Sequence, residues 1–223
     1  MCKQLLLSRY SHISPLTLPP IRNLMVDTII TNIPSDDIRT LVRLLLSSST
    51  PNVTETFCSL AKSHLDHSTP PATSNTRQPD FFTPPPDPHP TPAFESTLAK
   101  ARARYGAGLG SASIRVLLPI VDLASSGALK WSEGEELEEA LSIVDCDIAA
   151  AVPYAERELR RTETTTAEGE ERIAEELARR QKSAVDTLRV LKEKLQRIET
   201  TAGDRGCDNP FERSLDAVNA IEY

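Results

Sequence analysis

The sequence is poor in the features that mark specialised classes of protein. None of its apolar runs approaches the ~20 residues that a membrane-spanning helix needs, so we expect no membrane insertion. Its four cysteines, Cys2, Cys58, Cys146 and Cys207, form no CxxC pair. Scattered cysteines without a secretory signal are typical of reduced thiols, which predicts a cytoplasmic or nuclear protein without a metal site.

Motifs for catalysis are missing as well. The sequence holds no GxSxG, no HExxH and no Cys–His arrangement, and its four histidines leave few general bases. We therefore predict no catalytic residue and no cofactor. The alternative is an enzyme of unfamiliar type with its site between helices, for which the candidates are the turn Gly106–Ser111 and the acids near Asp145.

Basic residues are outnumbered by acidic ones. The chain has 25 Lys and Arg against 32 Asp and Glu, which gives a formal net charge of -7. General nucleic-acid binders depend on an excess of Lys and Arg, so this charge predicts no nucleic-acid partner.

Glycine is scarce and proline is unevenly distributed. Eight glycines stand against seventeen prolines, and nine of the prolines fall in residues 67–92. Bunched prolines between amphipathic segments predict an all-α protein whose helices are separated by an extended linker. The expected parts are a disordered leader at 1–24, a helical hairpin at 25–66, a Pro-rich disordered linker at 67–92, a helical bundle at 93–199 closed by a long heptad-patterned helix at 166–199, and a tail with a short helix at 200–223.

Residues 1–24 contain Lys3, Arg9 and Arg22 but no acidic residue. This composition is typical of a mitochondrial transit peptide, which would make the chain a mitochondrial matrix protein. Three prolines cut short any amphipathic helix in the segment. The alternative is an unstructured leader, or a native start at Met25.

Two amphipathic helices are predicted in the hairpin. Ser35 followed by two aspartates is typical of a helix start, and so is Thr50 followed by Pro51. Each helix carries an apolar stripe that has to be covered by later helices or by a partner. The stripes are Ile38, Leu41, Val42, Leu45 and Leu46 in the first helix and Val53, Phe57, Leu60, Ala61 and Leu65 in the second.

The linker offers two kinds of docking feature. Pro85-Pro86-Asp87-Pro88 fits a minimal PxxP pattern, although no Arg or Lys lies close enough to orient an SH3-type ligand. Thr69, Thr83 and Thr91 each precede a proline and are candidates for phosphorylation. The pair Phe81-Phe82 is expected either to attach the linker to the folded part or to serve as a small anchor.

The bundle begins with a helix from Phe94 that ends at the turn Gly106–Ser111. We expect these glycines to break one helix and to let the next one pack closely, with phosphate binding as the alternative. Leu109–Ala124 is nearly continuously apolar, which predicts a buried helix that is broken or kinked at Pro119.

An acidic helix follows. Ser132 and Glu135 have capping-box spacing, and seven acids with no base lie between Glu133 and Asp147. A solvated acidic face explains this run; a binding site for a basic partner and a carboxylate metal site around Asp145 and Asp147 are the alternatives. Pro153 should bend this helix without ending it.

The segment Glu168–Glu199 has the clearest helical pattern of the chain. Its apolar positions alternate in spacings of three and four, which places them on one stripe of a helix. The stripe can pack inside a single-chain bundle, or it can mediate self-association through residues 184–198. In either case we expect the C-terminal half of the helix to project and meet a partner, through Leu188, Leu191, Leu195 and Ile198.

Asn209-Pro210-Phe211 resembles the short peptide motif bound by EH domains, which act in endocytic and vesicle traffic. The resemblance implies that these three residues bind such a domain. A local role explains the same letters, with Asn209 as helix cap, Pro210 in the first turn and Glu212 completing a capping box. Together these patterns predict a non-enzymatic helical protein that binds other proteins or acts as a scaffold.

Overall fold

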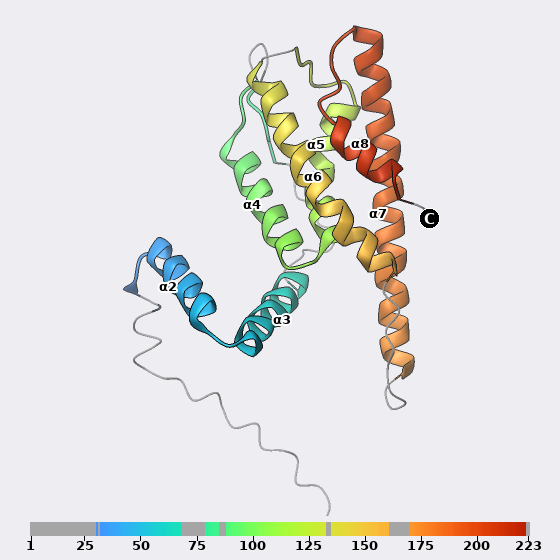
Figure 1. Ribbon diagram of the computed structural model, residues 1–223. Helices are drawn as coiled ribbons and strands as arrows, with labels where there is room; N and C mark the ends of the chain where they lie inside the picture. Colours follow the sequence, from blue (N-terminus) through green and yellow to red (C-terminus); the bar gives the residue numbers. More distant parts are fainter. Residues whose placement is uncertain are drawn as a thin grey trace, which may run out of the picture. The chain divides into compact units, whose positions relative to one another are not determined.

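The computed structural model describes residue 30 and residues 32–67, 79–84, 88–132, 135–160 and 170–221. All regular elements in these ranges are helices, which confirms the all-α class (Figure 1). The chain forms two compact units, and the boundary between them falls after Thr54. The helices are α2 (Ser35–Ser48), α3 (Pro51–His67), α4 (Pro92–Gly106), α5 (Gly110–Ser125), α6 (Glu136–Arg160), α7 (Glu170–Arg205) and α8 (Glu212–Asn219).

Both helices predicted for the N-terminal hairpin are present, with α3 beginning at Pro51 as expected. The start of α2 differs, because Pro34 occupies the N-cap position and Ser35 is already helical. Asp36 and Asp37 still lie in the first turn, where the helix dipole favours acids. The pairing of the two helices as a hairpin stays a prediction, because the boundary between the two units lies inside α3.

The second unit is a bundle in which α5 contacts α4, α6 and α7 (Figure 1). Ile114, Leu117, Ile120 and Val121 of α5 have no exposed surface, as the apolar sequence predicts. The expected break at Pro119 does not occur, and α5 continues to Ser125. Proline in a helix interior loses one backbone hydrogen bond and can still be tolerated where neighbouring helices hold both halves in place.

The turn between α4 and α5 ends one helix and brings the next against α6. Gly108 has a φ of +75°, and the N–H of Leu109 donates to the carbonyl of Arg104 at 2.9 Å. A left-handed glycine followed by such a bond is a Schellman C-cap. Two residues later, a Cβ on Gly110 would lie 2.2 Å from the backbone nitrogen of Ala155 in α6. The predicted end of the first helix is therefore confirmed. The close approach at Gly110 is to α6, whereas we expected it toward the helix that the glycines end.

α6 runs without interruption through Pro153, as predicted. Its expected start at Ser132 is wrong, because the helix begins at Glu136. One half of the capping box is nevertheless formed, since the Glu135 carboxylate accepts a hydrogen bond from the Ser132 N–H at 3.1 Å.

The apolar stripe of α7 lies inside the bundle. The exposed fractions of Leu188, Leu191, Leu195 and Ile198 are all 0%, and α7 contacts α5, α6 and α8. Full burial of a side chain of this size contributes about 1.5–3 kcal/mol. The stripe therefore belongs to the single-chain core, and the self-association alternative would require these side chains to leave it.

The direction in which α7 projects also differs from expectation. Its first turns extend past the end of α6 (Figure 1), and Ala174 and Ala178 are exposed. Where the two helices meet, the Gln181 amide donates to the carbonyl of Leu159 at 3.2 Å and so satisfies one of the last carbonyls of α6. The first turns therefore project from the bundle, and not the C-terminal half, whose Leu188, Leu191, Leu195 and Ile198 are buried.

Part of the predicted linker is packed on the bundle. Phe81 and Phe82 are buried, and the rings of Phe82 and Phe94 lie 5.3 Å apart. The backbone N–H of Thr91 donates to the carbonyl of Phe81 at 3.0 Å, and α4 begins directly afterwards at Pro92. The phenylalanine pair therefore attaches this segment to the folded part. The leader 1–24, Thr69 and most of the PxxP pattern lie outside the described residues.

We expect Gly110→Ala to destabilise the bundle by at least about 1–3 kcal/mol, because the new methyl group meets backbone atoms that cannot move aside. Gly203→Ala is the matched control: it lies in α7 with nothing within 4 Å of its Cβ position, so it should be neutral or stabilise by up to ~1 kcal/mol. Urea unfolding of both variants measures the difference. Equal stability of the two variants would contradict the close helix crossing.

Candidate functional site

The most prominent surface feature in the described residues is a set of exposed apolar side chains on α2 and α3. No residue of α2 is buried. Leu41, Leu44 and Leu45, at helical spacing, are 48%, 59% and 58% exposed. Large apolar side chains gathered on one helix face mark a site for protein association more often than an inert surface. We call these three residues the apolar face of α2.

α3 has an apolar face of the same kind. Val53, Phe57 and Leu60 recur at intervals of four and three, and Leu60 is 66% exposed. The opposite side of the helix carries polar residues such as Glu55 and Ser59. An amphipathic helix whose apolar face stays in water loses the burial that normally stabilises it. This face therefore favours binding to another apolar surface.

The residues predicted to bind a partner lie elsewhere. Leu188, Leu191, Leu195 and Ile198 are in the core, as described above. Within the Asn-Pro-Phe sequence, Phe211 has no exposed surface and Pro210 is also buried. An EH-type domain could contact Phe211 only after this segment had left the bundle, so binding by these residues stays an untested prediction.

The local role of Asn209 is confirmed in part. Its side-chain oxygen accepts a hydrogen bond from the backbone N–H of Phe211 at 3.0 Å, which forms an Asx turn. Asn209 is nevertheless not the cap of α8, because the helix begins at Glu212 and Phe211 occupies the N-cap position without a side-chain bond.

The cap of α8 is supplied by α6. The carboxylate of Asp145 accepts a hydrogen bond from the backbone N–H of Ser214 at 2.7 Å, and the Ser214 hydroxyl donates to the Asp145 carbonyl at 2.9 Å. Both residues are buried. A carboxylate at a helix N-terminus satisfies a free N–H and interacts favourably with the helix dipole. Asp145 therefore fastens α8 to the bundle.

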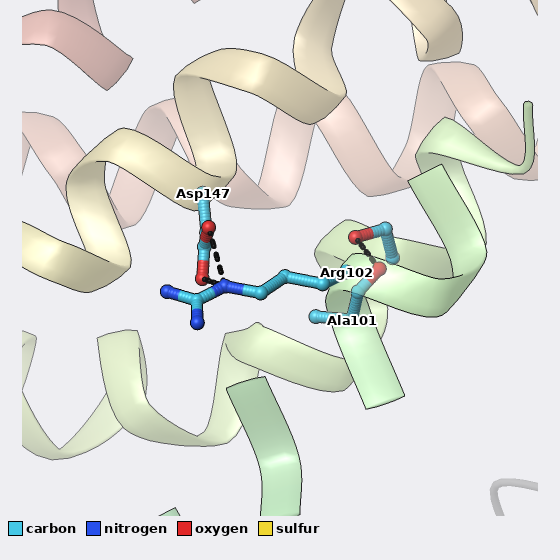
Figure 2. Close-up of polar contacts among 4 residues, drawn as sticks. Ala101, Arg102 and Asp147 are labelled. Atoms are coloured by element: carbon cyan, nitrogen blue, oxygen red, sulfur yellow. Dashed lines mark hydrogen bonds and ion pairs between the residues drawn. The ribbon is translucent and has the colours of Figure 1, made fainter. Parts of the chain in front are cut away.

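Asp147 has a different neighbour. Nε of Arg102 in α4 donates to both carboxylate oxygens of Asp147, at 3.0 and 2.8 Å (Figure 2). The hydrogen bond that Arg102 donates to Asp147 raises the pKa of the Arg102 guanidinium against the opposing effect of its partial burial. Asp145 and Asp147 thus join α6 to two different helices, and among the described residues no group of three or more His, Cys, Asp or Glu side chains is arranged to hold a metal ion.

The turn Gly106–Ser111 is also used by the fold. The amides of Gly108 and Leu109 donate to carbonyls of α4, and the Ser111 hydroxyl donates to the Glu158 carboxylate at 2.5 Å. A phosphate-binding turn needs its amides free to point at the ligand. Two amides of the turn, the Ser111 hydroxyl and the carboxylates of Asp145 and Asp147 are therefore engaged in structural contacts.

One polar feature was not predicted from the sequence. An open groove of about 400 Å³ lies between α5 and α7, and three of its lining residues are basic: Arg115, Arg179 and Lys182. Leu118 and Val190 supply apolar surface in the same groove. Arg115 and Arg179 are 64 positions apart in the chain, so no local sequence pattern could reveal that they line one groove.

Comparisons of the chain with models of protein families, with curated protein sequences and with solved structures each find no match. The helices of the described ranges also include none with the length and hydropathy that a bilayer crossing requires. The function therefore has to be inferred from the chain's own residues.

We expect Asp145→Ala to destabilise the protein by about 1–3 kcal/mol, because the Ser214 N–H would remain buried without its acceptor. Glu139→Ala, an exposed acid on the same helix, should change the free energy of unfolding by less than about 0.5 kcal/mol. Hydrogen exchange should show α8 opening more often in the first variant only. Unchanged protection of α8 in Asp145→Ala would refute the capping role.

Proposed function

We propose that this chain is a non-enzymatic protein-binding or scaffold protein whose binding surfaces are the apolar faces of α2 and α3. The observation that supports this most strongly is the exposure of Leu60 and Leu44, at 66% and 59%, in helices of which residues 35–66 include no buried side chain. Ile143 and Val185 are the exposed large apolar residues in the described part of the bundle, and six of the others lie on these two helices.

The chemistry of the faces fits recognition of an apolar groove. Anchors at i, i+4 and i+7, such as Val53, Phe57 and Leu60, are how a helix inserts into a hydrophobic groove of another protein. A half-exposed Leu or Phe that becomes fully buried contributes roughly 1 kcal/mol. Three such anchors on one helix give a weak to moderate affinity after the cost of association, which suits a reversible interaction.

A cytoplasmic or nuclear location belongs to the same proposal, and the three described cysteines, Cys58, Cys146 and Cys207, are free thiols that support it. The mitochondrial alternative depends on residues 1–24. Sequencing of the N-terminus of the native protein separates the two, because an intact Met1 rules out processing of a transit peptide.

A photo-crosslinking amino acid at Phe57 should give a discrete covalent product with the partner in the native source. The same group at Ser59, exposed on the polar side of α3, should give none. Leu60→Glu should reduce the Phe57 product at least tenfold because it places a charge in the apolar contact, whereas Ser59→Glu adds the same charge outside it.

Two results would contradict this function. Crosslinking of equal yield from Phe57 and Ser59 would indicate contact without a defined face. Loss of the product in both Glu variants, with the bundle still folded, would indicate that charge alone and not the apolar face decides binding.

A further inference from the structure

The groove between α5 and α7 is lined by both basic and apolar side chains. Arg115 from α5 and Arg179 and Lys182 from α7 line it together with one acid, Asp186. The Asp186 carboxylate is 3.0 Å from the guanidinium of Arg189, which lies on the exposed side of α7. The groove is therefore locally positive although the chain has a net charge of -7.

The positive charge is held in place. Arg115 donates a hydrogen bond to the hydroxyl of Ser183, which fixes its guanidinium across the groove. Nearby, burial and the charge of Arg115 lower the pKa of Arg104, a residue with 5% of its surface exposed. Like charges crowded in this way make the site a favourable place for an anionic group.

The groove is elongated and has two chemically different ends. Its lining residues on α7 run from Arg179 to Val190, which corresponds to about 16 Å, or three helical turns. On α7 the basic lining residues, Arg179 and Lys182, occupy the first turn, and Val190 lies in the last one. A small inorganic anion would leave the apolar end uncovered, and a nucleic-acid backbone would find charge over only part of the length.

We propose that this groove binds a short segment of another protein that carries carboxylates at one end and an apolar anchor at the other. The carboxylates pair with Lys182 and Arg115, and the anchor covers Leu118 and Val190. Arginine suits carboxylate recognition because its planar group donates several hydrogen bonds in a fixed geometry. This site is independent of the apolar faces of α2 and α3.

The test uses the full chain and a displayed library of peptides about 12 residues long, which is enough to cross the groove in either a helical or an extended conformation. Selection on the native chain, with counter-selection on Lys182→Glu, should enrich peptides with Asp or Glu near one end and Leu, Ile or Phe near the other. Enrichment of peptides without acids, or no enrichment over the Lys182→Glu chain, would overturn the proposal.

The affinity of the best peptide gives the quantitative result. Lys182→Glu should weaken binding at least tenfold, and raising the salt concentration should weaken it further through screening. Arg197→Glu is the matched control, since it makes the same charge change at an exposed position of α7 outside the groove. Equal weakening of binding in both variants would overturn the proposal, because it would indicate general attraction of anions to the chain. Competition by a single-stranded oligonucleotide as effective as that of the unlabelled peptide would overturn it for the same reason. Unfolding curves of both variants establish that the bundle is intact.

Discussion

Burial of the C-terminal half of α7 is the interaction on which the rest of the structure depends. Leu188, Leu191, Leu195 and Ile198 have no exposed surface, and each contributes about 1.5–3 kcal/mol of burial. The net stability of a typical domain is about 5–15 kcal/mol, so these four side chains are indispensable to it. Because α7 contacts α5, α6 and α8, this burial helps to fix the positions of all three helices.

Polar groups then specify which helix faces which. Gly110 permits the backbone of α5 to approach α6, and Asp145 and Asp147 direct α6 toward α8 and α4. Buried polar contacts of this kind are costly unless each partner is satisfied, so they tolerate few alternative arrangements. Asp145 and Asp147, the candidates for a metal site, thus orient the helices of the bundle. Glu135, Glu136 and Glu139 of the same acidic run are exposed, as a solvated face requires. The binding surfaces that we propose lie outside this set of contacts.

The sequence allowed most helices to be predicted, but not which helices pack against each other. Periodicity identified the stripe of α7, and the Thr50-Pro51 pattern identified the start of α3, because both depend on residues close together in the chain. It could not show that the stripe packs on α5 and α6 and not on a second copy, since the same pattern satisfies both. The cap of α8 by Asp145 and the basic groove at Arg115 and Lys182 join residues more than 60 positions apart. The match of Asn209-Pro210-Phe211 to a peptide motif could not show whether these residues are accessible, and in the structure Phe211 is buried.

The most direct test of the central claim is hydrogen exchange of the amides from Leu188 to Ile198 at two protein concentrations, about 100-fold apart. If the stripe is the core of a single-chain bundle, these amides exchange as slowly as those of Ile114–Val121 in α5, and dilution leaves their rates unchanged. Protection that disappears on dilution while α5 stays protected would contradict the account, because it would show that association between chains, and not the bundle, buries this half of α7.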